Sequence, residues 1–340
     1  MFRQFPTLFR EENRENLLVF VDKGRVVCHI GLTLNTLCLA GCLVHVACAG
    51  AVATAEAWRG RGLASALLEH AAAHARQHGA LLMLISGGRG LYLRAGAAPV
   101  GQHVDMLVLG EARSRLHTAG VSVTPFHTAE LPAWQALYRA KTARYLRPPE
   151  DWTAFEANRL CIGRPVDWWT IRRQSAPCAY CVVEPPREGK PALVHEWAGG
   201  QGAMAAAMPA LLENYAPAPV LLRVQPYEST LRGWLLAAGA EERPPGTDET
   251  LLMLDAVGLV ECCWPHFEEY AGRATANRLL AAATDAGGLI LQLNGEHEQV
   301  CNGPADAARF LFGSPGHPGP GPVWDRFLPI PMAAYGLNFI

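Results

Sequence analysis

The chain has 340 residues, of which half are hydrophobic and 18% are charged, so it holds enough apolar material for two or three packed domains. Its formal net charge is −2, with no basic excess to attract nucleic acid and no acidic block that would form a solvating tail. Composition and charge therefore argue against a nucleic-acid partner and favour a globular protein.

The ten cysteines do not form the pattern of a disulfide framework. Many stand inside apolar segments, as Cys28, Cys38, Cys42 and Cys48 do, where a thiol packs as a small hydrophobe. Residues 1–13 contain no apolar run followed by a small-residue cleavage site, so we expect no signal peptide. A reducing cytoplasm fits these features best.

One segment raises the question of a membrane span, because residues 26–55 contain no Asp, Glu, Lys or Arg. Polar and turn-forming residues interrupt it at Asn35-Thr36 and Ala40-Gly41, and Val, Cys and Thr are frequent within it. Such a sequence is typical of core strands joined by tight turns. We therefore expect strands here and no membrane partner.

In chain order, the first unit begins with strands at 17–21 and 26–34, joined by a turn at 22–24. A strand at 44–54, a glycine-containing loop at 59–62 and a helix at 63–78 follow, and Gly79 ends the helix. A strand at 81–85, a short helix and a strand at 103–109 complete the unit. We predict a mixed α/β (α+β) domain over residues 1–118.

The second unit repeats this order of elements, so we predict a diverged internal duplication over residues 119–255. Its expected elements are strands at 121–123, 178–183, 193–197, 220–224 and 251–254, and helices at 131–144, 152–158, 203–214 and 230–238. A smaller third unit over 256–340 is expected to contain helices at 265–271, 274–283 and 305–312, a strand at 289–294, and an apolar tail.

The segment Arg59-Gly60-Arg61-Gly62-Leu63-Ala64 carries the clearest chemistry, because it joins a strand to an alanine-rich helix. The start of a helix offers unpaired N–H groups and the positive end of the helix dipole, glycines allow a close approach, and arginines add charge. Together these features predict a pyrophosphate cradle. Ser65 stands where a dinucleotide fingerprint has its third glycine, which disfavours a nicotinamide or flavin site.

The spacing Arg59-x-x-Gly62-x-Ala64 resembles motif A of the GNAT N-acetyltransferases, and it follows a strand and opens a helix as that motif does. The chain further resembles the Eis-like branch, in which a GNAT domain, a degenerate GNAT domain and a sterol-carrier-protein-like domain follow one another. The stretches at 86–96 and 335–340 carry this likeness, as does the absence of a second motif A. The resemblance covers nearly the whole chain, most closely from Phe5 to Gly101.

This resemblance implies an enzyme that moves acetyl from acetyl-coenzyme A directly to an amine on a small molecule or protein, without a metal, in a homo-oligomer. It assigns the cofactor to Val52, Ala53, Thr54, Arg59, Gly60, Arg61, Gly62, Leu63, Ala64, Ser65 and Gly87. Tyr92 would be the general acid, since a phenol stays protonated at neutral pH. The free carboxylate of Ile340 would be the base, with Glu56 as the fallback.

The resemblance has one departure, because the GNAT fold usually opens with a strand and a helix before the segment that begins here at Phe2. A shortened enzyme, a misassigned start or altered acceptor binding would each account for it. Plainer interpretations also stay open: a simple helix start at 59–64, a core role for Tyr92, and a merely buried Ile340. A non-catalytic module that binds coenzyme A or a lipid is the alternative function.

Overall fold

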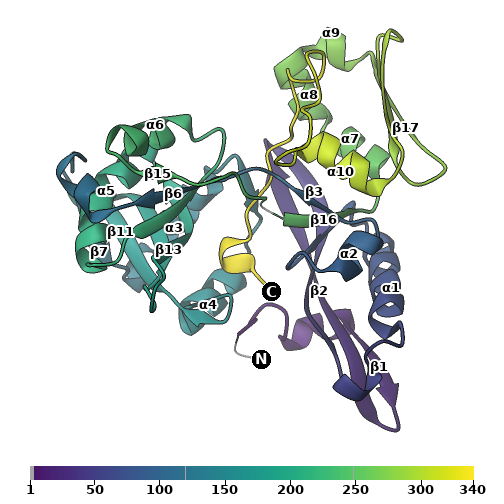
Figure 1. Ribbon diagram of the computed structural model, residues 1–340, viewed down its shortest axis with the longest axis horizontal. Helices are drawn as coiled ribbons and strands as arrows, with labels where there is room; N and C mark the ends of the chain where they lie inside the picture. Colours follow the sequence, from purple (N-terminus) through teal and green to yellow (C-terminus); the bar gives the residue numbers. More distant parts are fainter. Residues whose placement is uncertain (1–3, 119, 248) are drawn as a thin grey trace.

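Two mixed sheets of seven strands each dominate this computed structural model, which describes residues 4–118, 120–247 and 249–340. Each sheet forms one body with its own helices, and a smaller helical unit with three strands sits beside the first sheet (Figure 1). This is the mixed α/β class expected from the sequence, with neither a helical bundle nor a β-sandwich in the middle of the chain.

The first sheet has the order β1, β2, β3, β4, β16, β5, with β8 paired to β2. Its strands are β1 (Leu17–Asp22), β2 (Arg25–Leu39), β3 (Cys42–Thr54), β4 (Leu82–Ile85), β5 (Ala98–Val100), β8 (Ala143–Tyr145) and β16 (Glu249–Met253). Only the pair of β3 with β4 is parallel among these described strands. A parallel pair needs a crossover connection, which the helix between them supplies.

That helix, α1 (Leu63–Gln77), confirms the helix expected at 63–78. Leu67, Leu68, Ala71 and Ala75 are buried at helical spacing and pack on one face of the sheet. Gly79 has φ +76, a conformation that glycine adopts without steric cost, and it follows the helix as expected. The short helix α2 (Gly90–Arg94) covers the same face near the end of β4.

The uncharged segment 26–55 forms the long hairpin of β2 and β3, so the expected core strands are confirmed. Ala40 and Gly41 make its turn, both with positive φ. From Val46 to Ala49, alternate residues of β3 face two covered sides of the sheet, so charged side chains are disfavoured in this part of the strand. Within the described chain, no helix has the length and apolar character that a membrane crossing requires.

The second sheet has the order β15, β6, β14, β13, β12, β11, β7. Its strands are β6 (Val104–Val108), β7 (Val121–Pro125), β11 (Asp167–Arg173), β12 (Ala176–Glu184), β13 (Ala192–Gly199), β14 (Val220–Val224) and β15 (Glu241–Glu242). The helices of this body are α3 (Leu131–Arg139), α4 (Pro149–Asn158), α5 (Gln201–Asn214) and α6 (Ser229–Ala237). Helix α5 connects β13 to the parallel strand β14, as α1 connects β3 to β4.

The two sheets exchange strands, which the expected chain order did not anticipate. β6 was expected in the first unit, but it pairs with β14 in the second sheet. β16 was expected to close the second unit, but it lies between β4 and β5 of the first sheet. The pairings of β6 and of β16 thus both join residues on either side of the expected boundary after residue 118. Short strands carry no local signal of the sheet they join.

The third unit contains α7 (Ala256–Cys262), α8 (Trp264–Ala271), α9 (Arg273–Ala276), β17 (Leu279–Ala283), β18 (Leu289–Leu293), β19 (His297–Cys301) and α10 (Pro304–Phe312). The helix expected at 274–283 is wrong beyond Ala276, because Leu279–Ala283 pairs with β18 as a strand. Asn294 and Gly295 both have positive φ and make the hairpin turn that their sequence predicts. Tertiary pairing overrides the helix propensity of the alanines here.

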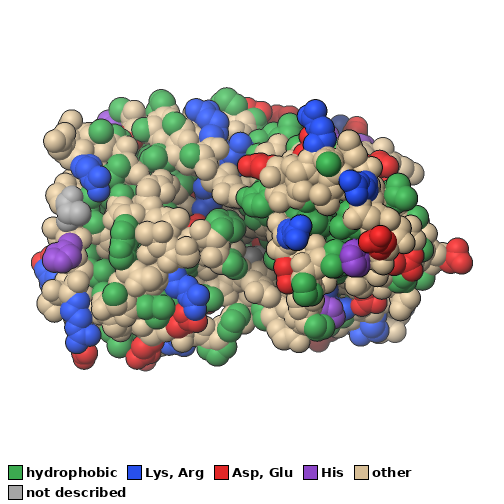
Figure 2. Space-filling view, turned by 90° about the horizontal axis from the view of Figure 1, so that it is seen from above, with side chains coloured by type: hydrophobic (Ala, Val, Ile, Leu, Met, Phe, Trp, Pro, Cys, Tyr) green, Lys and Arg blue, Asp and Glu red, His purple; other side chains and the backbone are tan. Residues whose placement is uncertain are grey.

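Shorter elements connect these parts. They are η1 (Glu11–Asn16), η2 (Glu56–Trp58), η3 (Gly110–Ser114), η4 (Thr128–Glu130), η5 (Gly336–Asn338), β9 (Leu160–Cys161) and β10 (Arg164–Pro165). The C-terminal segment, which includes η5, runs between the two large bodies rather than across the outer surface of the molecule (Figure 1). The surface is hollowed between the two halves of the molecule in the view of Figure 2. The C-terminus therefore reaches the junction on which the candidate site is built.

Candidate active site

The parallel strands β3 and β4 separate at one end, and this separation is the starting point of the site. Their pairing runs from Val46 and Leu82 to Ala49 and Ile85, and then β4 ends. β3 continues to Thr54, paired only with β2 on its other side. Beyond Ala49, the edge of β3 that faced β4 has no strand partner among the described residues, so its peptide groups can pair with an extended ligand.

The loop that follows β3 leads into the uncapped N-terminus of α1. Gly62 is the N-cap residue with φ +76 and makes no side-chain cap, and the first turn contains no acidic residue. Gly60 has φ +75, and a Cβ built on either glycine would meet no atom within 4 Å. The helix thus presents free N–H groups to an open, exposed surface, which is the geometry that binds phosphate.

Two guanidinium groups lie beside this loop. The Arg59 Nε donates to the carbonyl oxygen of Thr54 at 3.3 Å, and Arg61 Nη2 donates to that of Ala57 at 3.1 Å. Arg61 also stacks over the Trp58 ring, 4.6 Å from its centroid. All the cofactor residues expected from 52 to 65 therefore lie along one continuous path, from the open edge of β3 to the start of α1.

The C-terminus meets this path at the point where the two strands separate. Ile340 is 1% exposed and belongs to the core on the face of the sheet opposite α1. A Cβ built on Gly50 would lie 2.5 Å from the carboxyl carbon of Ile340 and still closer to its oxygen. Gly50 does not have a positive φ. Glycine is therefore required here for the close approach of the terminal carboxyl group rather than for backbone conformation.

Tyr92 lies on the other face of the same sheet. It is buried in the cluster that contains Ala49, Ile85 and the apolar residues of α1, whereas Cys48 and Ile340 belong to the cluster on the opposite face. Burial raises the pKa of the Tyr92 phenol, and the charge of Arg89 offsets part of that rise. Tyr92 is thus protonated at neutral pH, as a proton donor must be.

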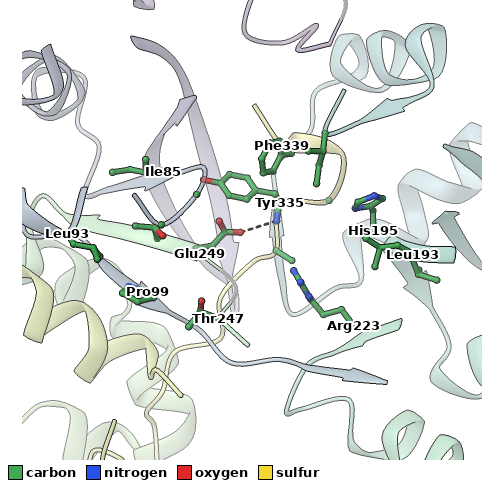
Figure 3. Close-up of a pocket in the computed structure, with 17 residues that line it drawn as sticks. Ile85, Leu93, Pro99, Leu193, His195, Arg223, Thr247, Glu249, Tyr335 and Phe339 are labelled. Carbon is green, nitrogen blue, oxygen red and sulfur yellow. Dashed lines mark hydrogen bonds between the residues drawn. The ribbon is translucent and has the colours of Figure 1, made fainter. Parts of the chain in front are cut away.

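Tyr335 is a second buried phenol near the site, and sequence reasoning missed it. Burial raises its pKa well above the ordinary value, and the carboxylate of Glu249 and the phenol of Tyr92 are among the groups that add to the rise. Its backbone N–H donates to Glu249 Oε1 at 3.1 Å, shown dashed in Figure 3. The only sequence signal for this contact was the apolar character of the tail.

A cavity of about 440 Å³ opens between the two large bodies at this position. Ile85, Leu93 and Pro99 line one side and His195 and Arg223 the other, while the tail contributes Tyr335 and Phe339 (Figure 3). Gly87, expected to contact the cofactor, lies in the same lining. The cavity is therefore built from both sheets and the C-terminus, which no single stretch of sequence describes.

The polar groups of this cavity are held by partners. His195 Nε2 lies 2.9 Å from Glu184 Oε2, and burial lowers the pKa of His195 although that carboxylate opposes the shift. The imidazole is thus neutral at pH 7. Arg223 Nε lies 3.5 Å from Asp105 Oδ1. The cavity lining therefore combines apolar side chains with groups of both charges and a neutral imidazole.

Other residues singled out from the sequence lie elsewhere. Glu56 is exposed in η2, beyond the end of β3. His74 Nε2 contacts Asn16 Oδ1 at 2.8 Å, and His78 contacts the carbonyl of His74, so these ring nitrogens have protein partners. No group of three or more metal-binding side chains occurs in the part of the chain that the structure describes.

The corresponding junction in the second sheet borders a cavity of about 410 Å³, and a lysine side chain lies against its strand. β13 runs parallel to β14 and then leads through Gly199 and Gly200 into α5. There Lys141 Nζ donates to the carbonyl oxygen of Trp197 at 2.9 Å and lies over the indole ring. The lysine side chain therefore takes the strand carbonyl that an extended ligand would use.

Comparison with known proteins agrees with this geometry. Residues 2–96 match the family model described as the acetyltransferase (GNAT) family. No curated protein gives a match to the chain. Among solved structures, a GCN5-related N-acetyltransferase from Anabaena variabilis is similar with a TM-score of 0.62 and 17% identity, covering 85% of this chain and 74% of its own.

Two further structures are similar in fold. Eis1 from Mycobacterium abscessus has a TM-score of 0.57 and 15% identity over 77% of this chain and 70% of its own. A GCN5-related N-acetyltransferase from Kribbella flavida has a TM-score of 0.56 and 16% identity over 86% and 72%. Identities this low establish the fold, and the family match concerns the segment that carries the phosphate loop. The match of residues 2–96 to the GNAT acetyltransferase family, together with this fold, supports an acyltransferase enzyme.

Proposed function

We propose that this protein transfers an acetyl group from acetyl-coenzyme A directly to an amine, with Ile340 supplying the base and Tyr92 the acid. The observation that carries the proposal is the contact of the Ile340 carboxyl group with Gly50, where β3 and β4 separate. The glycine leaves room for the carboxyl group to approach β3 where an extended ligand would pass.

The residues present fit coenzyme A. The open edge of β3 at Val52, Ala53 and Thr54 supplies peptide groups for a pantetheine arm, and the uncapped start of α1 suits a pyrophosphate. The empty space around Gly60 and Gly62 leaves room for phosphate oxygens. Acetyl-coenzyme A would supply an activated acyl group as a thioester.

The protein's own groups would then move two protons. An amine acceptor is mostly protonated at neutral pH, so a base must remove a proton before nitrogen can bond to the acyl carbon. The Ile340 carboxylate would take it directly or through water. Breaking the carbon–sulfur bond leaves a thiolate, and the buried Tyr92 phenol would donate a proton to it. The nitrogen loses a second proton as it becomes an amide, and this proton would restore the Tyr92 phenol directly or through water.

The remaining features are parts of the same proposal. The second sheet, with its β13–α5–β14 crossover and the lysine that occupies the Trp197 carbonyl, would be a degenerate GNAT domain that binds no coenzyme A. The third unit would correspond to a sterol-carrier-protein-like domain. The amine acceptor would bind in the cavity that the residues of Figure 3 line. The proposal also includes a cytoplasmic location and assembly into a homo-oligomer.

The test appends Gly-Ser after Ile340, which keeps every side chain but moves the terminal charge. We expect the extended protein to bind acetyl-coenzyme A with an unchanged Kd and to acetylate a panel of amines about 100-fold more slowly or worse, as loss of a general base does. Wild-type turnover by the extended protein would direct attention to Glu56. Binding without turnover of any amine by the natural chain would favour a non-catalytic module.

A further inference from the structure

A buried ion pair outside the cavity holds the C-terminal segment from the second body. Arg147 Nη1 and Nη2 donate to the two carboxylate oxygens of Glu196 at 2.8 and 2.6 Å. Their side chains are 1% and 5% exposed. Arg147 lies in the segment between β8 of the first sheet and α4, and Glu196 lies on β13 of the second sheet. The pair thus sits at the junction of the two bodies.

The remaining hydrogen-bonding capacity of this pair goes to the tail. Arg147 Nε donates to Asn338 Oδ1 at 2.7 Å, and the backbone N–H of Leu337 donates to Glu196 Oε2 at 3.0 Å. A Cβ built on Gly336 would approach the Glu196 carboxylate, with its Cδ at 3.0 Å. The three residues of η5 are therefore in close contact with the ion pair.

The pair itself has little freedom to move. The guanidinium lies over the ring of Tyr138, 3.8 Å from the centroid, and also near the rings of Trp152 and Phe155. Tyr180 donates its hydroxyl to Glu196 Oε1 at 2.8 Å. Burial by itself would raise the pKa of Glu196, but Arg147 and the hydrogen bonds from Leu337 and Tyr180 outweigh it, so the carboxylate stays ionised.

We propose that Arg147 and Glu196, acting through Asn338 and Leu337, are positioning residues that hold the Ile340 carboxylate at its place beside Gly50. The inference rests on the proposed function, in which that carboxylate is the base. Asn338 is two residues from the terminus, so the carboxyl group lies within a reach of about 7 Å of chain. Tyr335, bound to Glu249 on the first sheet, anchors the tail on its other side.

A purely structural role would be served as well or better by apolar side chains, because the desolvation of a buried ion pair offsets much of its attraction. The ion pair instead fixes orientation. Its planar guanidinium and carboxylate groups hold the Asn338 side chain and the backbone N–H of Leu337 in one geometry. A catalytic group displaced by about 1 Å can lose on the order of 100-fold in rate. The positioning role therefore predicts an effect on turnover without an equal effect on stability.

The experiment uses the full chain and two changes, Asn338→Leu and the Gly-Ser extension after Ile340, alone and together. Asn338→Leu removes the acceptor for Arg147 but leaves the ion pair intact. We expect it to lower kcat about tenfold or more while the Kd for acetyl-coenzyme A stays near the natural value, with a lower Tm because the buried Arg147 Nε loses its acceptor. Asn338→Asp, which keeps an oxygen at that position, should restore most of the rate.

The double variant distinguishes the outcomes. If both changes act through the terminal carboxylate, Asn338→Leu causes no further loss in the extended protein. Equal losses in the natural and extended proteins, or no loss in either, would overturn the positioning role while leaving the base assignment intact. An extension that costs nothing would overturn the base assignment, and the positioning role with it.

A second variant keeps the inference testable should Asn338→Leu lower Tm too far for kinetic measurement. Gly336→Ala places a methyl group against the Glu196 carboxylate and strains a backbone with φ +51, so it displaces the tail from the ion pair without removing any hydrogen-bonding group. The positioning role predicts the same non-additive loss of kcat when this change is combined with the extension. Additive losses would count against it.

Discussion

At the scale of single residues, the contact between Gly50 and Ile340 is the most demanding feature of the site. Gly50 lies within a strand, where glycine weakens packing and local order. Its φ is not positive, so the close approach of Ile340, by its carboxyl group and its Cγ1 atom, explains the missing side chain. A single methyl group added at Gly50 would therefore prevent the Ile340 carboxyl group from lying against β3.

Gly50→Ala should consequently lower acetyl transfer about 100-fold, because the added Cβ displaces the Ile340 carboxylate from where it is needed. The matched control is Gly110→Ala, at a glycine that has neither a positive φ nor any atom within 4 Å of a built Cβ. Steady-state kinetics and melting curves of both proteins check this. Equal activity in the two variants would show that the carboxylate position does not govern the rate.

Tyr92→Phe keeps the buried ring and removes only the hydroxyl. If Tyr92 is the acid, turnover should fall about 100-fold or more while acetyl-coenzyme A binding is retained. Because burial raises the pKa of Tyr92, its loss of a proton should limit the natural enzyme only above the ordinary tyrosine pKa of about 10. Tyr335→Phe, at the neighbouring phenol, is the comparison. A fully active Tyr92→Phe enzyme would reduce Tyr92 to a packing role.

At the scale of elements, the phosphate loop and α1 form a unit whose binding can be tested without any acceptor. Acetyl-coenzyme A should raise Tm, since a ligand that binds only the folded state stabilises it. Gly62→Asp should abolish that shift by placing a negative charge at the uncapped helix start. The size of the shift in each variant is read by differential scanning calorimetry.

The chain offers a close control at the other end of the same helix. Gly79 has the same φ of +76 as Gly62, and a Cβ built on it also meets nothing within 4 Å. Gly79→Asp should therefore suffer the same backbone strain but keep the full response to acetyl-coenzyme A. If Gly62→Asp also kept the response, the coenzyme would bind elsewhere.

At the scale of the whole molecule, the two bodies are tied by exchanged strands, by the tail, and by the Arg147–Glu196 pair. Removing one partner of a buried ion pair leaves an uncompensated charge, which costs about 3–5 kcal/mol. Glu196→Gln should therefore lower the free energy of unfolding by an amount of this order. The exposed bidentate pair of Arg232 and Glu242 provides the control, and Glu242→Gln should leave stability nearly unchanged.

The pH dependence of this effect has a definite sign. The pKa of Glu196 is lowered in the folded protein, so its contribution to stability is present above the unfolded value near 4.5 and is lost as pH falls through the folded value. The stability difference between the natural protein and Glu196→Gln should therefore shrink on acidification. Chemical denaturation at several pH values measures it, and a difference that grew toward acid pH would contradict the assignment.

The sequence by itself determined the elements whose signals are local. The β2–β3 hairpin, α1 with its glycine stop, and the path from β3 to the phosphate loop follow from apolar periodicity, turn residues and a short spacing motif. The buried tail was likewise foreseen, because an apolar terminus is poorly solvated. These features depend on residues that are neighbours along the chain.

Only the tertiary structure decided what depends on residues far apart in the sequence. Three features have no local signal, because partners distant in the sequence select them. They are the exchange of β6 and β16 between the sheets, the strand at Leu279–Ala283, and the hydrogen bonds of the Arg147–Glu196 ion pair to the tail. The same reason explains why Gly50 was missed: it contacts a carboxyl group 290 residues away, which only folding brings to the point where β3 and β4 separate.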